Sequence, residues 1–159
     1  MRRAFGKTIV ELAQRDEKLI LLIGDVEQNM DEYKAKFPNR FMNLGLCEQT
    51  MIGIAAGMAM EGLRPIVYSI TPFLIERPFE QIKLDLDQQK LPVILVGYAD
   101  YPTHGPTHSA LNAEGLMALL KNTRSYFPKN LEETSKALID AYESKGPAFV
   151  SLKRDKEAK

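Results

Sequence analysis

Short apolar runs alternate with amphipathic segments along the whole chain. The runs that have the length and character of buried strands are residues 18–23, 65–70, 92–97 and 148–152, with shorter candidates at 40–44 and 125–127. The segments that fit helices are residues 4–15, 31–37, 73–89, 112–121 and 131–144. Repeated alternation of this kind predicts an α/β fold: one doubly wound, mostly parallel sheet with helices on both faces.

One further helix, predicted for residues 50–62 (TMIGIAAGMAMEG), is apolar on nearly every side. Such a helix is buried, either in a core or in a subunit interface. Glu48 lies at its start, where a partly desolvated carboxyl group is suited to holding or sharing a proton. The same pattern also fits a helix-entry glutamate stabilised by the positive end of the helix dipole.

The composition narrows the range of functions. The 159 residues fit one domain, and 21 basic residues balance 21 acidic ones, so the charge does not indicate a nucleic-acid or membrane partner. Cys47 is the only cysteine, which excludes an internal disulfide framework and a multi-cysteine metal site. We expect a cytoplasmic protein, since neither a signal peptide nor an apolar run long enough for a bilayer is present.

Parallel α/β sheets bind ligands at the carboxyl ends of their strands. Those ends carry Gly24-Asp25 and residues 45–48, 69–73 and 98–108, and no nucleotide-binding glycine motif or nucleophile elbow occurs. The segment 98–108 holds the only histidines, His104 and His108, around a proline. Without a third metal-binding side chain beside them, we do not expect a metal site. The two histidines fit either a catalytic loop or an ordinary surface loop.

Four segments, taken in order, resemble the pyrimidine-binding domain of the transketolase-like thiamine diphosphate enzymes. They are residues 40–67 (RFMNLGLCEQTMIGIAAGMAMEGLRPIV), Phe73 with residues 77–86 (RPFEQIKLDL), residues 105–108 (GPTH) and residues 146–154 (GPAFVSLKR). That superfamily includes transketolase, deoxyxylulose-phosphate synthase and the beta subunits of 2-oxo acid dehydrogenases. The resemblance covers almost the whole chain.

The resemblance implies how thiamine diphosphate would be bound. Glu48 would hydrogen-bond a ring nitrogen of the aminopyrimidine, which helps the cofactor to lose a proton from its thiazolium carbon. Phe73 would stack on the aminopyrimidine, although it also fits a core phenylalanine at a helix start. The resemblance also places Asp25 and Leu46 near the cofactor.

On the substrate side, the resemblance implies a catalytic His108 that hydrogen-bonds substrate oxygens. Arg154 matches an arginine that holds a substrate phosphate, although it also fits a solvated charged tail. Two positions depart from the family pattern and leave the substrate open. His104 replaces the aspartate that usually precedes GPTH, and Arg77 is one residue further from Phe73 than its counterpart in deoxyxylulose-phosphate synthase.

The part of the family pattern that binds the diphosphate is not found in this sequence. The only Gly-Asp pair, Gly24-Asp25, is not followed by the expected glycine or by the downstream asparagine that completes the Mg²⁺ site. We therefore expect residues 1–159 to form the pyrimidine-binding domain alone, without the diphosphate-binding and C-terminal domains. A partner subunit carrying GDG and the downstream Asn would hold Mg²⁺, with two copies of each chain in a heterotetramer.

The resemblance favours a transferase that moves a two-carbon ketol unit between sugars. Two alternatives stay open. One is a beta-type subunit of a 2-oxo acid decarboxylase or dehydrogenase, whose LCEQ sequence also contains a cysteine at the position of Cys47. The other is a non-catalytic pairing module.

Overall fold

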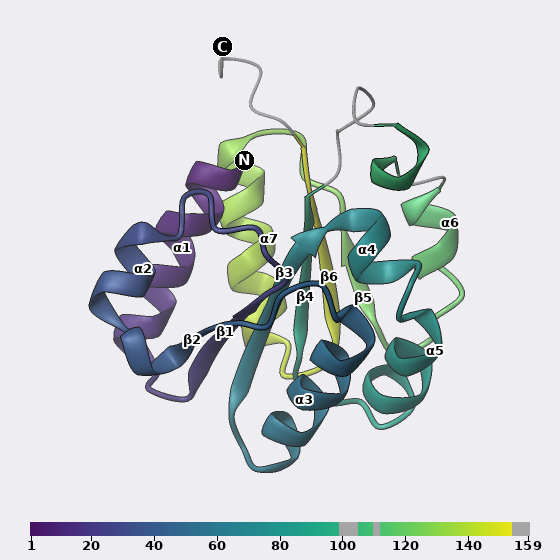
Figure 1. The fold of residues 1–159 in the computed structure, drawn as a ribbon, viewed down its shortest axis with the longest axis horizontal. Coiled ribbons are helices and arrows are strands. Elements are labelled where there is room, and N and C mark those ends of the chain that lie inside the picture. Colours follow the sequence, from purple (N-terminus) through teal and green to yellow (C-terminus); the bar gives the residue numbers. More distant parts are fainter. Residues whose placement is uncertain (99–104, 110–111, 154–159) are drawn as a thin grey trace.

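The computed structural model describes residues 1–98, 105–109 and 112–153, and it forms a single parallel sheet between two layers of helices (Figure 1). The strands are β1 (Leu19–Ile23), β2 (Phe41–Asn43), β3 (Arg64–Ile70), β4 (Ile94–Tyr98), β5 (Arg124–Tyr126) and β6 (Ala148–Leu152). They are hydrogen-bonded in the order β2-β1-β3-β4-β6-β5, and every pairing is parallel. The predicted fold class is confirmed.

Helices cover both faces of the sheet. The helical segments are α1 (Arg2–Arg15), α2 (Asp31–Lys36), η1 (Pro38–Arg40), α3 (Glu48–Met60), α4 (Thr71–Ile75), α5 (Phe79–Gln81), the π-helical η2 (Ile82–Asp87), η4 (Pro106–His108), α6 (Ala113–Met117) and α7 (Leu131–Glu143). In Figure 1, α1, α2 and α7 lie on one side of the sheet, and α3 to α6 lie on the other. Within the described residues, every helix is too short or too polar to cross a membrane.

Strand residues supply two cores because successive side chains point to opposite faces. Leu19, Leu21 and Ile23 of β1 pack under α1, α2 and α7. Ile20 and Leu22 of the same strand pack under α3 to α6. All five residues are buried, because helices cover both faces of the sheet. The strand sequence is therefore continuously apolar and does not alternate between apolar and polar residues.

The single helix predicted for residues 73–89 is wrong. The chain forms α4, breaks, and resumes as α5 and η2. Pro78 explains the break, since it has no backbone N–H to donate and it disfavours the helical conformation of the preceding residue. Arg77 therefore lies in a bend between two short helices.

Two other helices also differ from expectation. The helix predicted for residues 112–121 is reduced to α6. Asn112 precedes it as the N-cap, and its side-chain oxygen accepts a hydrogen bond from the Gly115 N–H (2.8 Å). The all-round burial expected of α3 holds on one side only. Gly53 and Gly57 are exposed, and Met60 retains 57% of its accessible surface.

Candidate functional site

Glu48 is the first residue of α3, and the turn that precedes it sets its position. The chain leaves β2, passes through Gly45 in the left-handed region (φ 70°), and enters α3 after Cys47. The Gly45 N–H donates to the side-chain oxygen of Asn43 (3.0 Å). This turn holds the Glu48 side chain against the domain, where the residue is only 3% exposed.

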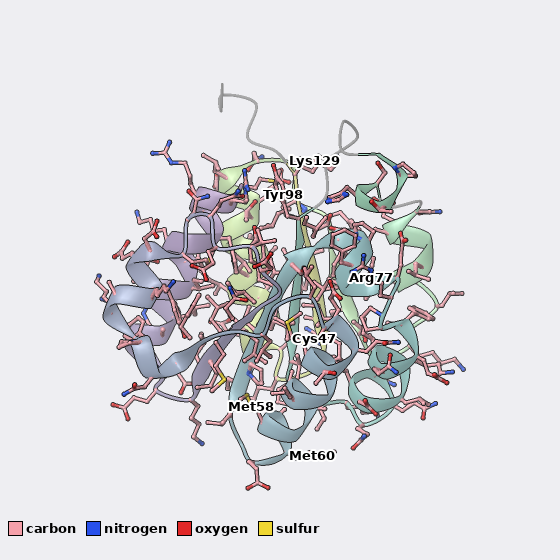
Figure 2. The ribbon with its side chains drawn as sticks, viewed as in Figure 1. Cys47, Met58, Met60, Arg77, Tyr98 and Lys129 are labelled. Atoms are coloured by element: carbon pink, nitrogen blue, oxygen red, sulfur yellow. The ribbon has the colours of Figure 1, made fainter. Side chains whose placement is uncertain are left out.

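Arg77 connects Glu48 to Phe73. Its Nη1 atom donates to Glu48 Oε1 at 3.1 Å, and its Cζ atom lies 3.9 Å from the centre of the Phe73 ring. The side chains of this ion pair differ in exposure, at 48% for Arg77 and 4% for Glu48. Figure 2 shows Arg77 beside α4, close to the start of α3, which is marked by Cys47. A buried carboxylate is thus paired with a cation that reaches it from the surface.

His108 completes the group from a different segment. Its ring meets the Phe73 ring edge-on, with 4.9 Å between the ring centres. The hydroxyl of Thr107 lies 3.0 Å from His108 Nδ1, so that nitrogen already has a hydrogen-bonding partner. Phe73 itself is 8% exposed. The structure therefore brings four of the sequence-predicted residues together: Glu48, Phe73, Arg77 and His108.

The structure describes two of the other predicted residues, Asp25 and Leu46. Asp25 follows β1 with a positive φ of 62°, its side chain is exposed, and its N–H donates to Asn43 Oδ1 (3.3 Å). Leu46 retains 69% of its accessible surface. His104 and Arg154 lie outside the described residues, so their predicted roles stay predictions. Across the part of the chain that the structure describes, no group of three or more His, Cys, Asp or Glu is placed to hold a metal ion.

Two positions near the site were not singled out from the sequence for a role. Asn43 joins the turn after β1 to the turn before α3, because its side-chain oxygen accepts from both Asp25 and Gly45. Thr71 begins α4, two residues before Phe73, and is fully buried. Its hydroxyl has no hydrogen-bonding partner among the described residues. The Thr-Pro pair at a strand end signals a helix start but does not indicate this burial.

Gly97 allows Thr71 to sit this deeply. A Cβ atom at residue 97 would lie 2.6 Å from the Thr71 hydroxyl and 2.9 Å from Phe149 Cε2. Any side chain at residue 97 would therefore push α4 away from the sheet. Since Phe73 belongs to α4, the close packing at Gly97 helps to place the aromatic ring of the site.

The fold is a parallel α/β sheet, and this group of side chains follows the carboxyl ends of its strands, the edge at which such folds bind ligands. Residues 1–158 match the family model described as the transketolase pyrimidine-binding domain, and the chain belongs to that family. The predicted resemblance is confirmed.

Relatives of this chain are longer proteins. A 33.6 kDa protein of uncharacterised function in the fasciation locus of Rhodococcoides fascians is 30% identical over 156 residues, which is 96% of this chain and 50% of that protein. The 1-deoxy-D-xylulose-5-phosphate synthases of Oleidesulfovibrio alaskensis and Syntrophomonas wolfei are 33% and 34% identical over 159 residues. The chain thus spans half of the first protein and about a quarter (24%) of each synthase.

Two solved structures share the fold. A split gene transketolase, described as an inactive beta4 tetramer, superimposes with a TM-score of 0.87 and 30% identity, over 99% of this chain and 52% of that chain. A transketolase from Campylobacter jejuni superimposes with a TM-score of 0.86 over 97% of this chain and 25% of its own. At 20% identity, the second similarity shows the fold alone.

Proposed function

We propose that this chain is the pyrimidine-binding subunit of a thiamine diphosphate-dependent, transketolase-like transferase. The observation that carries the proposal is the contact group at the start of α3. Glu48 is buried at a helix N-terminus, and the flat ring of Phe73 lies on the other side of the same arginine. An aminopyrimidine needs both features: a carboxyl group to share a proton with a ring nitrogen, and a flat apolar surface. When bound, the cofactor supplies the chemistry that cleaves a bond next to a ketone.

The described residues have separate roles in this proposal. Glu48 holds the proton at the pyrimidine nitrogen, and burial keeps water from competing for that proton. Phe73 orients the ring. His108 lies against Phe73, and its proposed role is to hydrogen-bond the substrate oxygens. Arg77, His104 and Arg154 are proposed substrate contacts, and Asp25 and Leu46 are proposed to line the cofactor site.

The diphosphate and Mg²⁺ are proposed to be held by a second chain that carries GDG and the downstream asparagine. Residues 1–159 would form the pyrimidine-binding domain only. The similarity to a split gene transketolase supports a division of the enzyme between two polypeptides.

Transfer of a two-carbon ketol unit between sugars is the proposed reaction. The GPTH sequence at 105–108 and the similarity to a split gene transketolase support this reaction. The departures at His104 and Arg77 lie on the substrate side. We therefore expect the donor or acceptor to differ from those of transketolase.

The exposed side of α3 is proposed to pair with a second copy of the chain, giving a homodimer within a heterotetramer. Gly53 and Gly57 are exposed on this helix, and Leu46 and Met60 near its two ends are 69% and 57% exposed. Glycines let two helix backbones approach closely, and the flanking apolar side chains gain from being covered. The tetrameric assembly of the split gene transketolase supports self-association.

The test is reconstitution with the chain that carries GDG. Calorimetry should detect tight, Mg²⁺-dependent binding of thiamine diphosphate by the mixture and only weak binding by this chain alone. The mixture should then transfer ketol units from phosphosugar donors in a coupled assay. Tight Mg²⁺-dependent binding by this chain alone would contradict the split arrangement. Turnover of 2-oxo acids without ketol transfer would replace the proposed reaction with that of the dehydrogenase beta subunits.

A further inference from the structure

Arg77 contacts the two side chains that the proposed cofactor ring has to reach. Its guanidinium group lies 3.9 Å from the Phe73 ring centre, the distance at which one flat group stacks on another, and it hydrogen-bonds Glu48 Oε1 at 3.1 Å. A pyrimidine ring bound between Phe73 and Glu48 would make the same two contacts. The arginine and the ring would therefore compete for one place.

The rest of the surroundings leave little room for both. Phe73 is 8% exposed and Glu48 is 3% exposed, so neither presents a free face. On the opposite side, α4 is packed against β4, where the Gly97 backbone leaves no space even for a methyl group next to Thr71. The Arg77 side chain is half exposed, so it can move without disturbing the core.

In the bend before Pro78, the Arg77 backbone is held by hydrogen bonds, whereas its side chain is half exposed. The Arg77 N–H donates to the Pro72 carbonyl (3.4 Å), and its own carbonyl accepts from the Gln49 side chain (3.5 Å). The guanidinium group, in contrast, is half exposed and is held by its ion pair with the buried Glu48 and by its contact with the Phe73 ring. Water competes for the exposed part of this cation, which weakens its hold on the carboxylate.

We propose that Arg77 is the gate of the cofactor site: its guanidinium group fills the place of the pyrimidine ring in the empty subunit and must swing out before the ring can bind. This inference rests on the proposed function, since it concerns the same site. The ion pair keeps a buried carboxylate compensated while no ligand is present. The cost of breaking that pair lowers the apparent affinity of the subunit for the ring.

The test uses the full chain and 4-amino-2-methylpyrimidine as an uncharged ring probe. Arg77→Ala should bind the probe roughly three- to tenfold more tightly than the wild type, because an occupant lowers apparent affinity by the fraction of chains that are open. Lys83→Ala is the matched control, since it removes an exposed cation from η2, the segment that follows α5. It should bind like the wild type. Equal affinities for wild type and Arg77→Ala would overturn the gate.

A second measurement follows the position of the Arg77 side chain in the wild-type chain by NMR. Protons that lie above an aromatic ring resonate upfield, so the Arg77 side-chain NMR signals, assigned through their loss in Arg77→Lys, should be upfield in the free chain. They should return to ordinary positions as the probe saturates the site. Signals that stay upfield at saturation would show that the arginine does not leave, and would also overturn the gate.

Two further variants separate the gate from the proposed function. Probe binding that is unaffected by both Glu48→Ala and Phe73→Ala would show that the ring does not bind here, which contradicts the cofactor site itself. Binding that depends on both residues but is indifferent to Arg77 would retain the site and reject the gate alone.

Discussion

Glu48 and Asp87 are both almost fully buried carboxylates, at 3% and 5% exposure, yet they are held in opposite ways. Asp87 ends η2 and accepts hydrogen bonds from the Asn122 N–H (2.9 Å) and the Thr123 hydroxyl (2.7 Å), with a longer one from the Asn122 amide (3.5 Å). Glu48 is paired with Arg77, a cation on a half-exposed side chain.

The two carboxylates differ in whether their hydrogen-bonding partners can leave. The donors to Asp87 are neutral groups on one short loop, and they cannot leave without unfolding that loop. In the proposed gate, the partner of Glu48 is exchanged for a ligand group while the backbone stays in place. Burial alone therefore does not identify a functional carboxylate; the mobility of its partner does.

The largest expected effect is on catalysis. In the reconstituted enzyme, Glu48→Gln should lower turnover by roughly 10²- to 10⁴-fold, the range for losing a placed proton donor or acceptor. Its free energy of unfolding should change by no more than about 1 kcal/mol, because the lost ion pair has a half-solvated partner. Glu80→Gln makes the same chemical change at an exposed position of α5 and should leave both quantities unaltered. Near wild-type turnover of Glu48→Gln would remove Glu48 from the mechanism.

The opposite result is expected at Asp87. Asp87→Ala should lower the free energy of unfolding by about 3 kcal/mol, because the donors of Asn122 and Thr123 lose their buried acceptor. Urea unfolding followed by circular dichroism measures the change. The variant that remains folded should bind the partner and turn over at close to the wild-type rate. A stable Asp87→Ala with low activity would reverse the distinction between the two carboxylates.

Acid should remove the contribution of Asp87 to stability. Burial raises the pKa of this carboxyl group, but the hydrogen bonds from Thr123 and Asn122 outweigh burial and bring the pKa below its ordinary value. A group whose pKa is lower in the folded state stabilises the protein above its unfolded pKa of about 3.9, and this is lost as the pH falls through the folded pKa. The difference in unfolding free energy between wild type and Asp87→Asn should therefore shrink below about pH 4.

Asp16 also contributes to the loss of stability in acid, so the wild type has to be compared with Asp87→Asn at each pH. The pKa of Asp16 is lowered, mainly by the hydrogen bond from the Tyr142 hydroxyl, and the pKa of Glu27 is lowered by Lys34, so acid acts on the domain at several places. The wild-type curve alone would not separate them. If the difference between wild type and Asp87→Asn stays constant down to the lowest pH at which both fold, the hydrogen bonds to Asp87 do not depend on its charge.

The sequence predicted the sheet, its helical layers and the four residues of the contact group, because these depend on local patterns and motif order. Glu48, Phe73 and His108 each follow a strand, and the carboxyl ends of parallel strands meet at one edge. The contact of Arg77 with both side chains depends on the break that Pro78 imposes, which a continuous helix over 73–89 concealed. The roles of Asp87 and Asn43 depend on loops distant in sequence, which residue patterns do not encode.

The smallest expected change in unfolding free energy is that of Thr123→Val, which tests how rigidly Asp87 is held. Thr123→Val preserves the shape of the side chain and removes one of the donors, so the carboxylate keeps the Asn122 N–H. The expected loss is about 1 kcal/mol, the usual net contribution of one hydrogen bond, and clearly less than for Asp87→Ala. A loss as large as that of Asp87→Ala would mean that the hydroxyl anchors the whole loop. A loss near zero would mean that the loop can rearrange around Asp87 as readily as Arg77 is proposed to leave Glu48, and the contrast between the two carboxylates would then fail.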